Sequence, residues 1–453
     1  MKKLKRRLTT TQITVFSFLP LIFIGAVLLS LPVSSASGQA TSFVDALFTA
    51  ATSVCVTGLV VVPTAVHWSL FGKIVILILI QIGGLGVVTV TSFLLLALGR
   101  KFSLSSRILL SDAFNLDTLK GLVQFLKKAF LGTLIAEAVG AVCYLPVFIP
   151  RYGAIKGVWF SIFHSVSAFC NAGLDIMGET GYAPYVHSAW ANFVTMALIV
   201  SGGIGFIVWW NIGKNIKSFL RTKRKRDLIS FSLHTKLVLC MTAGLIITGT
   251  VLFTAFEYNN PKTIGNFSFP QKVLAALFQS VTTRTAGFAT VSQKGLTVPS
   301  VILSIILMFI GGSSVGTAGG VKVTTVAVIV LSVVATIRGR DDTTCFQRRI
   351  SEKTVKKSIA VVLISFLTSI LAIVLLRFSE SGDTVDIIFE VYSALGTVGL
   401  TRDFTPLLST FGKLLLSACM FLGRIGPISM MIVFTVRGSN KALRLPEEKV
   451  SVG

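Results

Sequence analysis

Acidic residues, histidines and closely spaced cysteines are scarce in this chain of 453 residues. It has 18 Asp and Glu and 4 His. No apolar stretch holds paired carboxylates or a nucleophile beside a base, which argues against an enzyme that works inside a membrane. The 6 cysteines are scattered, without a Cys-x-x-Cys pair. We therefore expect no disulfide framework, no thiolate metal site and no catalytic residues.

Charge is also scarce, because 13% of the residues are charged and 53% are apolar. The mean hydropathy of +0.82 excludes a soluble globular protein. Apolar runs of spanning length occur at Thr11–Val33, Lys73–Leu98, Phe193–Ile212, Leu233–Phe256, Ile359–Leu376 and Leu414–Val436. They are too long for barrel strands, so the sequence predicts an all-α membrane protein. Met1–Arg7 could open a secretory signal. However, the apolar run after it exceeds the roughly 7–15 residues of such signals, so we expect a first span.

The formal net charge of +24 raises the alternative of a nucleic-acid-binding protein. The basic residues are grouped in five clusters: Met1–Arg7, Arg100–Arg107, Lys214–Arg226, Arg338–Lys357 and Arg437–Lys449. If the stretches between them cross the membrane an even number of times, all five lie on one face, which the positive-inside rule places in the cytoplasm. We expect a multi-pass protein of the cell membrane with both termini cytoplasmic. A contiguous basic face for DNA or RNA is absent, so no nucleic-acid partner is expected.

One short pattern occurs four times along the chain. Its glycines, Gly58, Gly173, Gly287 and Gly399, are separated by 115, 114 and 112 residues. A helix candidate too short to span precedes each of them: Phe43–Ser53, Gly157–Phe169, Gln271–Thr282 and Thr384–Ala394. A long apolar run precedes each short helix, and another follows each glycine. The pattern predicts four tandem repeats of helix, pore helix, filter loop and helix, with eight transmembrane helices around one pseudo-fourfold central pore.

The predicted division has six parts. Cytoplasmic tails occupy 1–11 and 438–453, and the repeats occupy 12–107, 108–228, 229–340 and 341–437. All four copies run in the same orientation. This argues against a secondary transporter of organic solutes, in which inverted repeats are typical.

The four glycine turns follow helices too short to cross, so the chain must turn back at membrane depth. Non-helical backbone is tolerated there only where it is buried in protein or lines a water-filled cavity. Rings of backbone carbonyls can replace the hydration shell of K⁺, and glycine reaches positive φ without strain. The candidate filter comprises Val54, Cys55, Val56, Thr57, Gly58; Cys170, Asn171, Ala172, Gly173; Arg284, Thr285, Ala286, Gly287; and Gly396, Thr397, Val398, Gly399. Later glycines such as Gly83 and Gly84 could equally serve close helix packing.

The repeated unit and its turns resemble the superfamily of Trk, Ktr and HKT potassium transporters, over nearly the whole chain. The resemblance rests on Val54–Gly58, Thr283–Phe288, Ser393–Thr401, Gly311–Gly320 and Phe421–Pro427. It is strongest to the membrane subunit of Ktr systems (KtrB type). It implies K⁺ uptake, a homodimer with one pore per subunit, and a cytoplasmic nucleotide-binding ring of the RCK (KtrA) type as partner.

The resemblance also bears on the choice of ion. Some Ktr systems depend on Na⁺, and relatives with Ser at the first filter glycine favour Na⁺. Glycine at all four positions of this chain favours K⁺ bound at the filter carbonyls. A sodium-permeable or Na⁺-coupled cation transporter of the same superfamily remains the alternative.

The last helix of the third repeat contains a glycine-rich interruption. Val301–Ile337 would be about 56 Å long as a straight helix, nearly twice the bilayer core. The candidate gate within it comprises Gly311, Gly312, Ser313, Ser314, Gly316, Thr317, Gly319 and Gly320. A phosphate-binding loop would need Lys directly after Gly, whereas Lys322 follows Val321. We expect a break in the helix and a movable loop beneath the filter; a passive kink is the alternative.

Arg424 lies within the last apolar run, where the other repeats have glycine. Arginine in mid-span costs at least about 2.5–3.5 kcal/mol on insertion scales, so it should face the protein interior or a water-filled cavity. We expect Arg424 to hold the 311–320 loop and tune its barrier; a structural arginine bound to helix ends is the alternative.

Overall fold

The computed structural model describes residues 10–86, 90, 122–178, 180–223 and 230–426. The C-terminal tail at 438–453, nearly all of the N-terminal tail at 1–11 and the predicted boundary between the first two repeats lie outside these ranges. The orientation of the termini, which rests on those tails, therefore stays a prediction.

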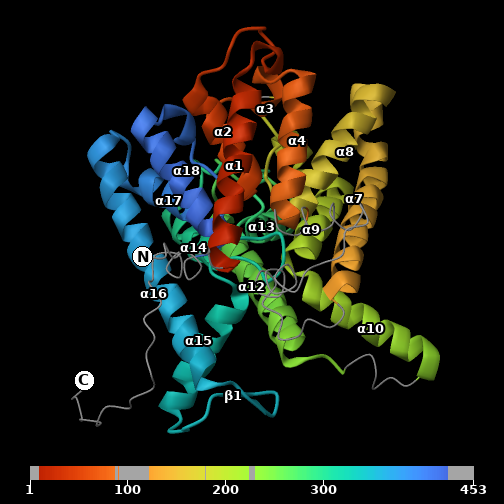
Figure 1. Ribbon diagram of the computed structural model, residues 1–453, viewed down its shortest axis with the longest axis vertical. Helices are drawn as coiled ribbons and strands as arrows, with labels where there is room; N and C mark the ends of the chain where they lie inside the picture. Colours follow the sequence, from red (N-terminus) through yellow and green to blue (C-terminus); the bar gives the residue numbers. More distant parts are fainter. Residues whose placement is uncertain (1–9, 87–89, 91–121, 179, 224–229, 427–453) are drawn as a thin grey trace, which may run out of the picture.

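The described chain is almost entirely helical (Figure 1). Its α-helices are α1 (Thr10–Ser30), α2 (Phe43–Cys55), α3 (Thr64–His67), α4 (Leu70–Leu85), α7 (Leu122–Tyr152), α8 (Ala154–Cys170), α9 (Ala189–Gly203), α10 (Phe206–Thr222), α12 (Leu233–Glu257), α13 (Phe269–Thr282), α14 (Val298–Phe309), α15 (Val323–Ile337), α16 (Glu352–Ser379), α17 (Thr384–Gly396) and α18 (Thr410–Ile425). Short 3₁₀ turns lie at Pro32–Ser34, Ala183–Tyr185 and Thr405–Leu407. A two-residue hairpin, β1 (Thr344–Cys345) with β2 (Arg348–Arg349), is the described β-structure.

Three of the described helices, within α7, α12 and α16, are long and apolar enough to cross a membrane. The pair α9 and α10, bent by 98°, makes a fourth if it counts as one span. Several shorter apolar helices accompany them, including α4, α14 and α15. Because α1, α4 and α18 begin or end beside residues outside the described ranges, the expected eight spans stay a prediction.

The predicted short helices lie close to the expected positions, and three of them extend further toward the glycines. α2, α8 and α17 continue to Cys55, Cys170 and Gly396. Each short helix packs against the long helix that precedes it, in the pairs α1 with α2, α7 with α8, α12 with α13 and α16 with α17. An amphipathic segment too short to span gains stability from this packing rather than from its own propensity.

Contacts between the repeated units follow one rule. The helix after each glycine turn packs against the short helix of the next unit: α4 with α8, α9 with α13, α14 with α17, and α18 with α2. The last contact returns to the start of the chain, so these helix pairs form a closed cycle.

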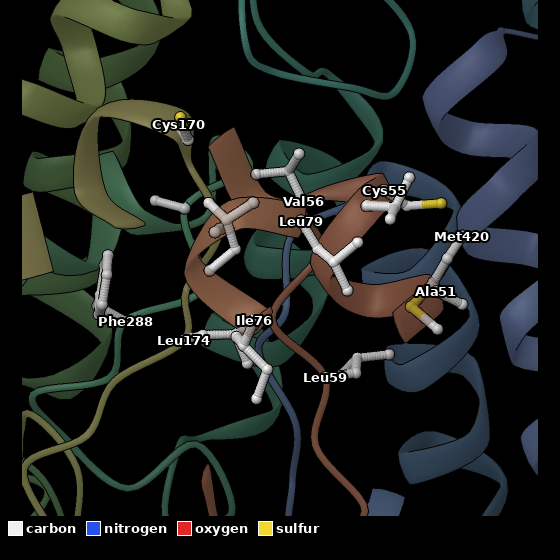
Figure 2. Close-up of a cluster of buried hydrophobic side chains, with 14 of the residues drawn as sticks. Ala51, Cys55, Val56, Leu59, Ile76, Leu79, Cys170, Leu174, Phe288 and Met420 are labelled. Carbon is white, nitrogen blue, oxygen red and sulfur yellow. The ribbon is translucent and has the colours of Figure 1, made fainter. Parts of the chain in front are cut away.

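A buried apolar cluster surrounds the turns. Figure 2 shows Cys55, Leu59, Cys170, Leu174 and Phe288, which flank three of the four glycines, as side chains of this cluster. Apolar side chains packed on their outer side limit the freedom of the turns, since protein interiors are close-packed.

Candidate functional site

All four glycine turns share one backbone conformation. The glycines have positive φ, at 99° for Gly58, 63° for Gly173, 83° for Gly287 and 94° for Gly399. The residue two positions earlier is also left-handed in each turn: Val56, Asn171, Thr285 and Thr397. Non-glycine residues rarely adopt this conformation, and it persists only where the surroundings impose it. The same pair of left-handed residues in all four turns therefore indicates a conformation that the surrounding structure imposes.

The four turns meet edge to edge. A methyl group built on Gly58 would lie 2.7 Å from the carbonyl oxygen of Ala172 and 3.1 Å from the Cα of Gly173. Each glycine faces the carbonyl oxygen that precedes the next glycine: Ala172 for Gly58, Ala286 for Gly173, Val398 for Gly287 and Thr57 for Gly399. The contacts run once through all four turns and return to the first, so the four turns form a ring, and we call Gly58, Gly173, Gly287 and Gly399 the ring glycines.

The carbonyl groups of these turns are left without hydrogen bonds. In the part of the chain that the structure describes, no hydrogen bond ends on the carbonyl oxygens of 56–58, 171–173, 285–287 or 397–399. Buried carbonyls are normally paired. Twelve unpaired oxygens on touching turns form an electronegative surface that suits a cation.

The turns are held from behind by hydroxyl groups that sequence reasoning missed. Thr52 Oγ1 accepts from the Gly58 amide at 2.9 Å, and Ser393 Oγ accepts from the Gly399 amide at 3.1 Å. Ser167 Oγ donates to the Leu174 carbonyl at 2.6 Å, and Thr282 Oγ1 donates to the Phe288 carbonyl at 2.6 Å. A hydroxyl five or six residues before each glycine was the signal in the sequence.

Several residues of the candidate filter lie beside the ring rather than in it. Val54 and Cys55 belong to the last turn of α2, and Cys170 and Gly396 end α8 and α17. The thiols of Cys55 and Cys170 are buried. The Arg284 guanidinium points toward α12, with Nη1 and Nη2 at 3.5 and 3.4 Å from Thr242. The candidate set thus narrows to residues 56–58, 171–173, 285–287 and 397–399.

The glycines in the helices that follow the turns serve close helix packing, as their sequence pattern allows. Gly83, Gly202 and Gly423 lie against the carbonyl oxygens of Val54, Phe169 and Leu395, each four residues before a ring glycine. A side chain at any of these three positions would collide with backbone. Small residues let helices approach in this way.

Residues 310–322 separate α14 from α15, as the glycine-rich composition predicts. The segment is tied to the end of α9, since the amides of Ser313 and Thr317 donate to the carbonyls of Gly203 and Gly202 at 2.9 and 3.2 Å. Thr317 Oγ1 also donates to the Phe169 carbonyl at 3.2 Å. The loop therefore contacts the short helix α8 as well as α9.

Arg424, on α18, reaches the same loop. Its Nη1 donates to the Thr317 carbonyl, and its Nη2 donates to the Gly83 and Gly84 carbonyls of α4. Within the described ranges the guanidinium makes no salt bridge. Carbonyl dipoles thus compensate this charge, and Arg424 connects the loop to α4.

Two further polar groups near the ring were not foreseen from the sequence. Glu137 of α7 is buried, accepts from Gln81 Nε2 at 3.1 Å and lies 3.7 Å from the Cys170 sulfur. Lys322 Nζ donates to the Ala318 carbonyl at 2.6 Å, within the loop that separates α14 from α15. Glu137 interrupts an apolar run, which was its sequence signal.

Comparisons with known proteins agree with this architecture. Residues 3–443 match the family described as "TrkH: Cation transport protein". The chain is 38% identical to Ktr system potassium uptake protein B of Bacillus subtilis, over 99% of this chain and 97% of that protein. It is 37% identical to the potassium/sodium uptake protein NtpJ of Enterococcus hirae, over 100% and 99% of the two chains.

A solved structure shares the fold. The crystal structure of the potassium transporter TrkH from Vibrio parahaemolyticus superposes with a TM-score of 0.72 at 16% identity, over 96% of this chain and 87% of that one. The family and these relatives are transporters rather than enzymes. From the match over nearly the whole length and the identity to its relatives, the chain belongs to the TrkH family of cation transport proteins.

Proposed function

We propose that this chain takes up potassium ions across the cell membrane through a passage at the centre of the four glycine turns. The closed cycle of contacts from Gly58 through Gly173, Gly287 and Gly399 is the observation that carries the proposal. A potassium ion in a narrow passage loses most of its water, and carbonyl oxygens arranged in rings replace it. Unpaired carbonyls on all four turns supply such oxygens.

The short helices add a field of the right sign. α2, α8, α13 and α17 end at the turns, so the partially negative ends of four helices are directed at one point. Acidic side chains are absent from the twelve ring residues. A ring of dipoles without full charges favours a monovalent ion, which can enter and leave, over a tightly held divalent ion.

We assign the gate to the 311–320 loop, with Arg424 as its latch. The three hydrogen bonds from Arg424 hold the loop to α4, and those of Ser313 and Thr317 hold it to α9. Breaking a few such bonds would free a glycine-rich segment, whereas a passive kink would not need a charged group bonded across repeats. The repeats 12–107, 108–228, 229–340 and 341–437 each contribute one quarter of the passage.

The family relationship extends the proposal to partners. The Ktr relatives are named as components of potassium uptake systems. We infer that this chain forms a homodimer, works with a cytoplasmic nucleotide-binding ring of the RCK type, and keeps both termini in the cytoplasm. Sodium permeation or coupling is the second candidate, favoured by the relative named a potassium/sodium uptake protein.

Growth of a bacterium that lacks its own potassium uptake, at low external K⁺, tests the proposal. Expression of this chain with its regulatory partner should restore growth, and Gly58→Ser should abolish the rescue or make it sensitive to Na⁺. Failure of the correctly inserted chain to rescue would contradict potassium uptake. Equal transport of Na⁺ and K⁺ by the native chain would favour the second candidate.

A further inference from the structure

A cavity of about 520 Å³ lies between α7 and α10, on the outer side of the second repeat. Its walls are mostly apolar and aromatic, and they include Trp209 and Trp210. In Figure 1, α10 passes below the first turns of α7 and leads away from the rest of the molecule. The cavity therefore lies away from the ring, where lipid would surround the protein.

Three lysines, Lys128, Lys214 and Lys217, line the same cavity. Lys128 Nζ lies 4.1 Å from the centre of the Trp210 ring. Among the described residues, no carboxylate lines the cavity and no salt bridge includes any of the three lysines. Three uncompensated positive charges beside an apolar cavity fit a ligand with an anionic group and a hydrocarbon part.

A buried hydroxyl also lines the cavity and lacks a partner. Thr133 is 1% exposed, and its Oγ1 makes no hydrogen bond within the described part of the chain. Buried polar groups are paired in the great majority of cases. An oxygen-bearing ligand in the cavity would satisfy this hydroxyl.

We propose that this cavity binds one anionic phospholipid from the leaflet that borders α10. The phosphate contacts the three lysines, and an acyl chain lies along the aromatic wall. α10 has the features of an interfacial helix, because it bends 98° away from α9 and exposes 38% of Trp209 and 36% of Trp210 beside its lysines. A free anion would use the lysines and leave the apolar volume empty.

The cavity wall is bonded to the 311–320 loop. Phe169, in the wall, accepts the Thr317 hydroxyl at 3.2 Å, and the amide of Phe206, also in the wall, donates to the Val315 carbonyl at 2.9 Å. A bound lipid would therefore rest on two residues that hold the loop and would bias its position. The effect of the lipid on the loop rests on the proposed function, whereas lipid binding itself does not.

Native mass spectrometry of the purified full-length protein in detergent tests the binding. Titration with phosphatidylglycerol should give a retained lipid, and phosphatidylcholine should be retained at least about tenfold more weakly. The triple variant Lys128→Gln, Lys214→Gln, Lys217→Gln should lose at least about tenfold in phosphatidylglycerol retention. The matched variant Lys353→Gln, Lys356→Gln, Lys357→Gln removes the same charge from the start of α16 and should retain the lipid as the native chain does.

A second pair of variants fills space rather than removing charge. A Cβ on Gly213, in the cavity wall, or on Gly244, on α12, would meet no atom within 4 Å. Gly213→Phe should displace the lipid, and Gly244→Phe should not. The proposal would be overturned if the two triple variants retained phosphatidylglycerol equally, or if the native protein retained both lipids equally. It would also be overturned if inorganic phosphate alone displaced the lipid, or if the native protein retained no lipid.

Potassium flux in vesicles separates lipid binding from the effect of the lipid on the loop. Potassium flux in vesicles with 30% phosphatidylglycerol should differ at least about twofold from flux in pure phosphatidylcholine, and the Lys128, Lys214, Lys217 variant should remove the difference. Lipid retention without any potassium flux would contradict the proposed function and leave the lipid site standing. Flux that ignores the lipid although the lipid is retained would overturn the coupling to the loop.

Discussion

At the scale of single residues, Gly58 and Gly38 share a left-handed backbone but differ in what surrounds them. Gly58 and Gly38 both have positive φ, at 99° and 71°. A Cβ on Gly58 would meet the next turn, whereas a Cβ on Gly38 would meet nothing within 4 Å. Alanine at either site bears a similar backbone strain of about 1 kcal/mol. A comparison of the two alanine variants therefore separates backbone strain from damage to the ring.

Gly58→Ala should therefore lower the discrimination of K⁺ over Na⁺ at least about tenfold, and Gly38→Ala should change it less than about twofold. Rubidium and sodium uptake into vesicles that hold the purified variants measures this ratio. If both variants lowered the ratio equally, strain rather than the ring contact would be responsible.

Arg424 poses a separate question, since its three hydrogen bonds all end on carbonyl groups. Arg424→Ala removes charge-assisted bonds of about 1.5–3 kcal/mol each. Even a net loss near 1 kcal/mol would raise the open fraction of a closed loop about fivefold. We expect potassium flux without the regulatory partner to rise by at least that factor. Unchanged flux together with unchanged response to the partner would exclude the latch.

At the scale of elements, the sequence predicted the short helices and the break between α14 and α15. All four short helices begin within three residues of the expected positions, and starts such as Phe43 and Thr384 follow a helix-start signal. The ends of α2, α8 and α17 were predicted too early, since left-handed residues such as Val56 and Thr397 can follow a helix only where tertiary contacts hold them.

The residues behind the turns could not be predicted in the same way. Glu137 of α7 and Gln81 of α4 lie 56 positions apart, and Thr317 meets Phe169 across 148 positions of sequence. Such pairs depend on how distant helices pack against one another, which the periodicity within one helix does not encode. The cyclic order of the turns is likewise a property of tertiary packing.

The hydrogen bond between Thr317 and Phe169 gives a test of the loop as an element. Thr317→Val keeps the shape of the side chain and removes a bond worth about 0.5–1.5 kcal/mol. If the bond stabilises the closed loop, the partner-free flux should rise about two- to tenfold. Thr290→Val is a matched control, because the Thr290 hydroxyl is buried without a partner among the described residues. A rise of the same size in both variants would contradict a closing role for this bond.

At the scale of the whole molecule, one ion pair joins the first unit to the last. Lys413 Nζ of α18 lies 2.7 Å from Asp45 Oδ1 of α2, with 19% and 21% of the two side chains exposed. Removal of one partner leaves a half-buried charge, at a cost of about 1–3 kcal/mol. Asp45→Ala should lower the unfolding midpoint in detergent by a few degrees.

The exposed pair Lys356 and Glu352 serves as the control for that prediction. Both side chains are 76% exposed, so solvent screens their attraction. Glu352→Ala should leave the midpoint unchanged within the error of a thermal melt. Equal shifts for Asp45→Ala and Glu352→Ala would show that closure between α18 and α2 does not depend on the Asp45 pair.

The central claim for the whole molecule is that carbonyl oxygens from all four turns hold one ion. Anomalous diffraction from crystals of the full-length protein grown in rubidium measures this directly. Peaks should lie on the axis between Gly58, Gly173, Gly287 and Gly399, surrounded by the carbonyls of residues 56–58 and their equivalents. Rubidium bound only away from this axis, or a ring without any peak at saturating rubidium, would contradict the account.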